Sequence, residues 1–214
     1  MDFDGTLFDT RRAITAAMDA VAWKRRGVCF RSDLIDVVIR NGLTLTEMFR
    51  TLIPEIDAVE LQSWVSDYRD VYNSSLGVRE SEPYPYLETV LQTLHVRTNA
   101  IYVVSNKGEA SVAAALDHHH LQQYFRKTIT ARGDRTPKPS PESFLEDILP
   151  EIAIEAVEQV LMIGDTEIDL NYARNIGAAS CWASYGYGSP ETCLPLGPHH
   201  VISDLRDLLL HVSQ

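Results

Sequence analysis

Short apolar runs that end in polar residues, each followed by a helical pattern, dominate the second half of the sequence. QVLMIGD (159–165) ends in an acid and precedes a helical stretch, 167–177, that Gly177 closes. AIYVVSN (100–106) ends in Ser-Asn before a helical stretch near 109–121. Strands that alternate with helices indicate a parallel sheet covered on both faces. The predicted fold class is therefore α/β, with a Rossmann-like parallel sheet.

The rest of the chain divides into two kinds of segment. Further strands are predicted at KTITA (127–131), ASCWAS (179–184) and HHVIS (199–203), and further helices at 86–95, PESFLEDIL (141–149) and LRDLLLHV (205–212). Residues 12–81 instead show helical spacing with no strand pattern, and prolines at 83 and 85 punctuate the chain after them. We predict an α/β core at 1–11 and 82–214 that carries a helical insert at 12–81.

Composition narrows the classes of function. The chain has 214 residues, of which 45% are apolar and 23% charged, and a formal net charge of -11. This charge argues against a nucleic-acid partner, which needs a basic face, but leaves a small anionic substrate possible. No apolar run reaches the ~18 residues of a membrane span. Three scattered cysteines, with no C-x-x-C pair, predict reduced thiols in a cytoplasmic protein. The oligomeric state cannot be predicted.

Three predicted strand ends carry polar side chains: Asp2 with Asp4, Ser105 with Asn106, and Asp165. In an open parallel sheet, ligands bind beyond the carboxyl ends of the strands, so these residues should converge on one pocket. Lys138, in a proline-stiffened loop before a helix, could reach the same pocket. Clustered carboxylates repel each other and need a cation, and hard oxygen donors suit Mg²⁺ beside a phosphate.

Each residue also has a plainer interpretation. Asp2 and Asp4 could belong to a solvated terminus, Ser105 and Asn106 could cap a helix, Lys138 could be an exposed loop lysine, and Asp165 could be a turn residue. Chemistry favours a shared role, because a carboxylate can attack phosphorus when a lysine and a metal offset its charge. A second acid could then protonate the leaving oxygen and later accept a proton from water.

Four ordered motifs carry a resemblance to a known family. DFDGTLFDT, VVSNK, the lysine of KPSPESF, and GDTEIDL resemble the motifs of the haloacid dehalogenase-like phosphatases along the length of the chain. KPSPESF, GDTEIDLNYARNIGA and WASYGYG are most similar to the phosphoglycolate phosphatase-like members. The helical insert resembles that family's cap, and we call residues 12–81 the cap from here on.

The resemblance implies catalytic roles for three residues. Asp2 matches the nucleophile, which is also a metal ligand, and Asp4 matches the acid/base, with its backbone carbonyl expected on the metal. Lys138 matches the charge-neutralising lysine that also contacts the substrate phosphate.

Two further groups of residues match the family's binding positions. Ser105, Asn106, Gly5 and Thr6 match positions that hold the substrate phosphate. Asp165 and Asp169 match the remaining acidic ligands of Mg²⁺, the expected cofactor.

The predicted function is a Mg²⁺-dependent phosphomonoester hydrolase that acts through an aspartyl-phosphate on a small organic phosphate. Two alternatives stay open: a sugar-phosphate mutase on the same scaffold, and a phosphate-binding protein without turnover. The candidate substrates include phosphoglycolate, sugar phosphates, nucleoside monophosphates and pyrophosphate.

The first motif begins unusually close to the start of the sequence. The strand that carries the nucleophile is expected in the middle of the sheet, yet only Met1 precedes Asp2. Because strands typically run ~5–6 residues, we expect the natural chain to begin further upstream, and an upstream reading frame that encodes apolar residues would support this.

Overall fold

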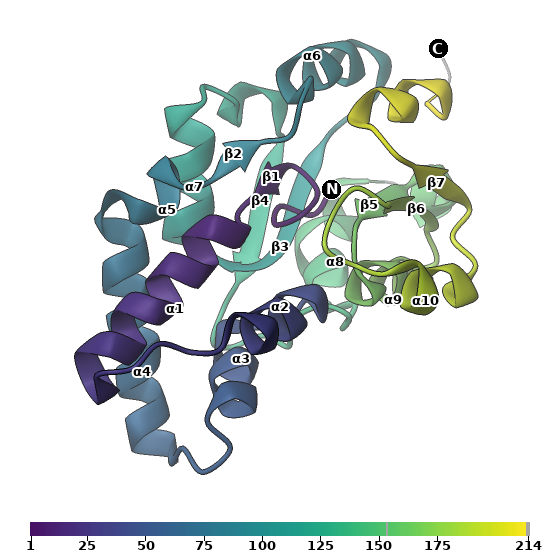
Figure 1. Ribbon diagram of the computed structural model, residues 1–214. Coiled ribbons are helices and arrows are strands. Elements are labelled where there is room, and N and C mark those ends of the chain that lie inside the picture. Colours follow the sequence, from purple (N-terminus) through teal and green to yellow (C-terminus); the bar gives the residue numbers. More distant parts are fainter. Residues whose placement is uncertain (153, 213–214) are drawn as a thin grey trace.

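The computed structural model of the protein describes residues 1–152 and 154–212. Its helices and strands fall into two groups (Figure 1). Helices α1 to α4 lie together on one side, and the strands with their flanking helices lie on the other. The fold is α/β with parallel sheets, as the sequence predicts. Among the described residues, no helix is long and apolar enough to cross a membrane.

Two parallel sheets form the α/β part. One pairs β3 (Tyr102–Gly108) with β4 (Lys127–Ala131), and the other orders β5 (Leu161–Gly164), β6 (Ala179–Ala183) and β7 (His200–Ile202). The accompanying helices are α6 (Leu87–Arg97), α7 (Glu109–His118), α8 (Glu142–Asp147), α9 (Glu167–Ile176) and α10 (Pro190–Cys193), with 3-10 turns at Gln122–Tyr124, Leu149–Glu151, Ile154–Gln159, Leu194–Leu196 and Leu205–Leu210. The predicted final helix is thus a 3-10 segment.

The first residues of the chain lie between the two sheets (Figure 1). On one side the Met1 ammonium donates to the Tyr102 carbonyl at 2.7 Å, and the Val104 amide donates to the Met1 carbonyl at 2.9 Å. On the other side the Asp2 amide donates to the Ile163 carbonyl at 2.8 Å. In place of the expected first strand, two residues therefore join β3 to β5, and they set Asp2 in the middle of the core.

The cap has its own hydrophobic core. Its first helix is α1 (Arg11–Arg26), which begins one residue before the predicted boundary. Then come α2 (Ser32–Arg40), α3 (Leu45–Leu52), α4 (Ala58–Val71), a π-helical turn, η1 (Tyr72–Leu76), and the short α5 (Gly77–Arg79). A capping box of Thr44 with Glu47 begins α3. Trp64, Tyr68 and Tyr72 are buried in this core.

The two chain segments that connect the cap to the core pair with each other as a short antiparallel ladder. β1 (Phe8–Asp9) pairs with β2 (Glu82–Pro83), so the chain leaves and re-enters the core at one place. This pair has no signal in the sequence, because two residues are too few to show a strand period. Tyr187, from the loop after β6, packs with the cap core although it lies outside residues 12–81.

Candidate active site

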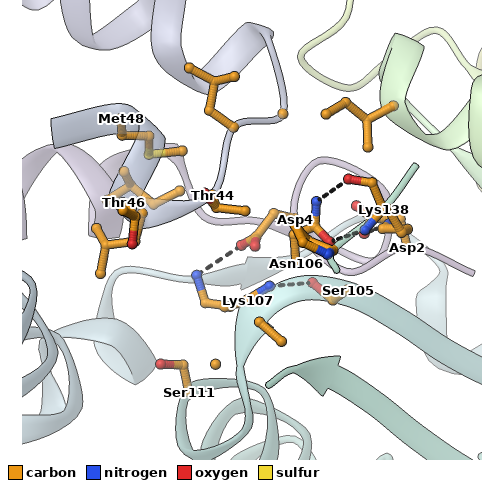
Figure 2. Close-up of a pocket in the computed structure, with 18 of the residues that line it drawn as sticks. Asp2, Asp4, Thr44, Thr46, Met48, Ser105, Asn106, Lys107, Ser111 and Lys138 are labelled. Carbon is orange, nitrogen blue, oxygen red and sulfur yellow. Dashed lines mark hydrogen bonds and ion pairs between the residues drawn. The ribbon is translucent and has the colours of Figure 1, made fainter. Parts of the chain in front are cut away.

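A cavity of about 580 Å³ lies between the cap and the carboxyl ends of the strands (Figure 2). The core contributes Asp2, Asp4, Ser105, Asn106, Lys107, Lys138 and Asp169 to its wall, and the cap contributes Ile14, Ile39, Thr44, Thr46, Met48, Tyr68 and Arg69. The residues that the sequence predicted at separate strand ends therefore line or adjoin one space. Neither Gly5 nor Thr6 is among the lining residues; both lie beside Asp165, as described below.

Three buried carboxylates form the centre of the site. One oxygen each from Asp2, Asp165 and Asp169 lies within 4.8 Å of the others. Lys138, itself buried, donates from Nζ to Asp2 Oδ1 at 2.6 Å and to Asp169 Oδ1 at 2.6 Å. One ammonium thus faces three acids, and this donor set fits a divalent metal ion, which would balance the remaining negative charge.

Burial and mutual repulsion shift the ionisation of the cluster. Burial raises the pKa of Asp2 to about 7, with Asp169 adding to the rise and Lys138 opposing it. Burial, followed by the charges of Asp169 and Asp2, raises the pKa of Asp165 well above its usual value. Burial alone would lower the pKa of Lys138, but the two neighbouring carboxylates raise it above its ordinary value. The lysine therefore stays charged.

Local backbone geometry places Asp165 against the first motif. Gly5 has φ +80°, and a Cβ on it would lie 2.1 Å from Asp165 Oδ2, so no larger residue fits. Thr6 Oγ1 donates to Asp165 Oδ1 at 3.1 Å, and the Tyr187 amide donates to Asp165 Oδ2 at 2.7 Å. Gly5 and Thr6 thus support an acid of the cluster.

Asp169 is fixed by the start of α9. The Thr166 amide and hydroxyl donate to Asp169 Oδ2 at 3.1 and 3.0 Å, which completes a capping box. The other oxygen of Asp169 is left to receive Lys138. The helix start therefore orients this carboxylate toward the cluster.

Asn106 holds the loop that carries Lys138. Its side chain donates from Nδ2 to the Lys138 carbonyl at 3.0 Å and accepts at Oδ1 from the Lys138 amide at 2.8 Å. Ser105 Oγ accepts from the Lys107 amide at 3.1 Å. The register of β3 against β4 shifts after Val104, and such irregularities re-aim side chains at a strand end.

Asp4 points away from the carboxylate cluster, toward the cap side of the cavity. Its Oδ1 accepts from Thr10 Oγ1 at 2.5 Å and from Lys107 Nζ at 3.0 Å. Figure 2 shows the bond from Lys107. Sequence reasoning assigned no role to Thr10 or Lys107. The ion pair of Lys107 with Asp4 spans 103 positions, so no local pattern predicts it. The one hint in the sequence is that Lys107 directly follows the Ser-Asn pair.

Tyr187 is a third residue of the site to which the sequence alone gives no role. Its hydroxyl accepts from the Thr10 amide at 2.6 Å and lies 3.2 Å from Thr10 Oγ1. Its backbone amide holds Asp165. One tyrosine therefore contacts both the acid cluster and the threonine that holds Asp4. WASYGYG was part of the resemblance, but that pattern alone does not reveal these contacts.

Comparison with known proteins gives matches along most of the chain. The profile described as haloacid dehalogenase-like hydrolase matches residues 1–183. The chain is 29% identical to a phosphoglycolate phosphatase of Vibrio cholerae, over 97% of this chain and 93% of that protein. Two solved structures have the same fold. One is a haloacid dehalogenase-like family hydrolase from Streptococcus pneumoniae, with a TM-score of 0.83 and 20% identity over 99% of this chain and 96% of that one. The other is a predicted phosphoglycolate phosphatase from Haemophilus somnus, with a TM-score of 0.86 and 19% identity over 99% of this chain and 96% of that one.

Proposed function

The chain belongs to the haloacid dehalogenase-like hydrolase family, and from this premise we propose that it hydrolyses phosphate monoesters with Asp2 as the nucleophile. The observation that carries the proposal is the position of Lys138, which bonds both Asp2 and Asp169 beside a cavity large enough for a small ester. A buried lysine there offsets the negative charge that would otherwise oppose attack by a carboxylate on a phosphate.

The reaction has two steps. In the first, an Asp2 carboxylate oxygen forms a bond to phosphorus, the bond from phosphorus to the ester oxygen breaks, and Asp4 gives its proton to that oxygen. In the second, water bonds to phosphorus and gives a proton to Asp4 while the bond to Asp2 breaks. The products are the alcohol and inorganic phosphate, and both aspartates return to their starting states.

Mg²⁺ is the metal that this donor set suits. Asp2, Asp165 and Asp169 would hold it, with the Asp4 carbonyl as a fourth protein oxygen. When bound, it supplies positive charge that stabilises the phosphoryl group in transfer. Lys138 supplies the same kind of charge from the protein itself.

Residues around the cluster bind and position the phosphoryl group. Ser105 lines the cavity from within β3, and Asn106 contributes by fixing the backbone of Lys138. Gly5 and Thr6 lie beside Asp165 and shape the turn after the nucleophile. The cap covers the leaving group and limits the access of water.

The substrate is a small organic phosphate ester. The relative from Vibrio cholerae is called a phosphoglycolate phosphatase, and phosphoglycolate is therefore the first compound to test. Sugar phosphates and nucleoside monophosphates complete the panel.

The test measures phosphate release from this panel with Mg²⁺ and with excess EDTA, using Asp2→Asn as the inactive control. We expect release that requires the metal and Asp2. A mutase would instead move the phosphoryl group within its substrate and release little phosphate, and a binding protein would release none. Undiminished turnover by Asp2→Asn would refute the proposal.

A further inference from the structure

Lys107 is a largely buried cation to which the proposed chemistry assigns no role. Its side chain is 10% exposed, and its Nζ lies 3.0 Å from Asp4 Oδ1 (Figure 2). On the cap side, Nζ lies 4.3 Å from the centre of the Tyr72 ring. The ammonium is therefore held between the carboxylate of the core and an aromatic face of the cap, in the wall of the cavity.

The other cations that line the cavity, within the described part of the chain, are placed differently. Lys138 is committed to Asp2 and Asp169. Arg132 pairs with acids on the surface, and Arg69 is exposed on α4. Lys107 is thus the buried cation beside the residue that protonates the leaving group.

This position sets the distance from Lys107 to the substrate. A general acid lies about 2.6–3.2 Å from the atom that it protonates. Since Nζ lies 3.0 Å from Asp4 Oδ1, it lies within roughly 6–8 Å of the ester oxygen. An anionic group on the carbon bonded to the ester oxygen falls within reach of the ammonium.

We propose that Lys107 binds a carboxylate carried next to the ester carbon and so makes the enzyme selective for phosphate esters of small 2-hydroxy acids. The inference rests on the proposed function, because it concerns the leaving group of the same reaction. A lysine ammonium has three donor hydrogens, so Lys107 can bond Asp4 and the substrate carboxylate together. The Tyr72 ring supports the cation from behind.

A purely structural role for Lys107 predicts a different result. If the lysine only neutralised Asp4 and held the cap in place, removing it would slow every ester by a similar factor. Selective binding of a carboxylate predicts instead that the loss depends on the charge of the leaving group. A hydrogen bond to a charged group changes binding by about 10- to 150-fold.

The experiment compares kcat/KM for three esters: 2-phosphoglycolate, neutral 2-hydroxyethyl phosphate of similar length, and the phosphate ester of 4-hydroxybutyrate, whose carboxylate is remote. The proteins are wild type, Lys107→Met, Lys107→Gln, Lys107→Arg, and Arg69→Met, which removes the exposed cap cation of the cavity wall. Lys24→Met is the matched control, because Lys24 is an exposed cap lysine paired with Asp67. Thermal unfolding shows whether each variant folds, and Lys107→Gln substitutes for a misfolded Lys107→Met.

We expect the wild type to prefer phosphoglycolate over both other esters by about 10- to 150-fold. Lys107→Met should lose this preference, Lys107→Arg should keep part of it, and Lys24→Met should keep all of it. The inference is wrong if Lys107→Met keeps the preference, if Arg69→Met removes it instead, or if the remote carboxylate is preferred equally. Failure of the wild type to hydrolyse any ester would overturn the proposed function itself.

Discussion

The two walls of the cavity are built in different ways. In the core wall, Asp2, Lys138 and Asp169 are buried, and each charged group is tied to another by hydrogen bonds of 2.6 Å. In the cap wall, Met48 and Tyr68 belong to an ordinary hydrophobic core, and their polar neighbours are partly exposed. The buried ion pairs of the core wall hold their side chains in fixed positions, which is what the proposed chemistry requires of them.

Asp2→Asn tests the core wall with the largest expected effect. The amide keeps the shape of the side chain but cannot act as the nucleophile, so kcat should fall by at least about 10⁴-fold. Turnover by purified protein, measured as phosphate release, checks this. Asp33→Asn, which changes an exposed cap aspartate paired with Arg31, should keep wild-type activity.

Asp4→Asn should give a smaller loss that depends on the leaving group. General acid catalysis contributes about 10²- to 10⁴-fold, and p-nitrophenolate leaves without protonation whereas an alkoxide does not. In single-turnover formation of the phosphoenzyme, alkyl phosphates should therefore slow by about 10²-fold or more, and p-nitrophenyl phosphate by much less. An equal loss for both substrates would assign the proton to another group.

The pH dependence of stability offers a test that needs no substrate. The folded-state pKa of Asp2 is about 7, above the 3.8 of the unfolded chain, so between these values the folded protein binds more protons. The contribution of Asp2 to stability is therefore lost as pH rises through this window. In metal-free protein at about pH 8, Asp2→Asn should raise the free energy of unfolding by about 1 to 4 kcal/mol.

Denaturant unfolding of both proteins, at about pH 4 and about pH 8, checks this expectation. The difference in unfolding free energy between wild type and Asp2→Asn separates the contribution of Asp2 from those of the other titrating groups. Added Mg²⁺ should stabilise the wild type at the higher pH, because a ligand that binds only the folded state adds to its stability. If the difference between wild type and variant is the same at both pH values, Asp2 is not held in the unfavourable environment described here.

The sequence predicted the core wall far better than the cap wall. β4 coincides with the predicted KTITA segment, and Asp165 follows β5 as expected, because apolar runs and polar strand ends are local signals. The ion pair of Lys107 with Asp4 has no such signal, since it depends on how segments 103 positions apart pack. The side chains of the cap wall depend in the same way on tertiary packing, which periodicity does not encode.

Tyr187 contacts both walls of the cavity, and its substitution should give the smallest of the expected effects. Its ring packs with the cap core, its amide donates to Asp165, and its hydroxyl accepts from the Thr10 amide. Tyr187→Phe keeps the ring and removes the hydroxyl, which accepts from the Thr10 amide and donates to Asp9 Oδ1 at 3.2 Å. The buried Thr10 N–H is then left without its partner. This should lower the free energy of unfolding by about 1 to 3 kcal/mol.

The effect of Tyr187→Phe on activity decides whether this link matters for catalysis. Thr10 also donates to Asp4, so a looser Thr10 should misplace the acid and slow alkyl phosphates by less than about tenfold. Esters of p-nitrophenol should be almost unaffected in the first step, because they need no acid. Thr10→Val, which removes the hydroxyl that holds Asp4 but keeps the amide, is the matched comparison. If both variants slow alkyl phosphates selectively, Tyr187 acts through Thr10 on the acid. If Tyr187→Phe lowers stability alone, the two walls are joined there by packing only.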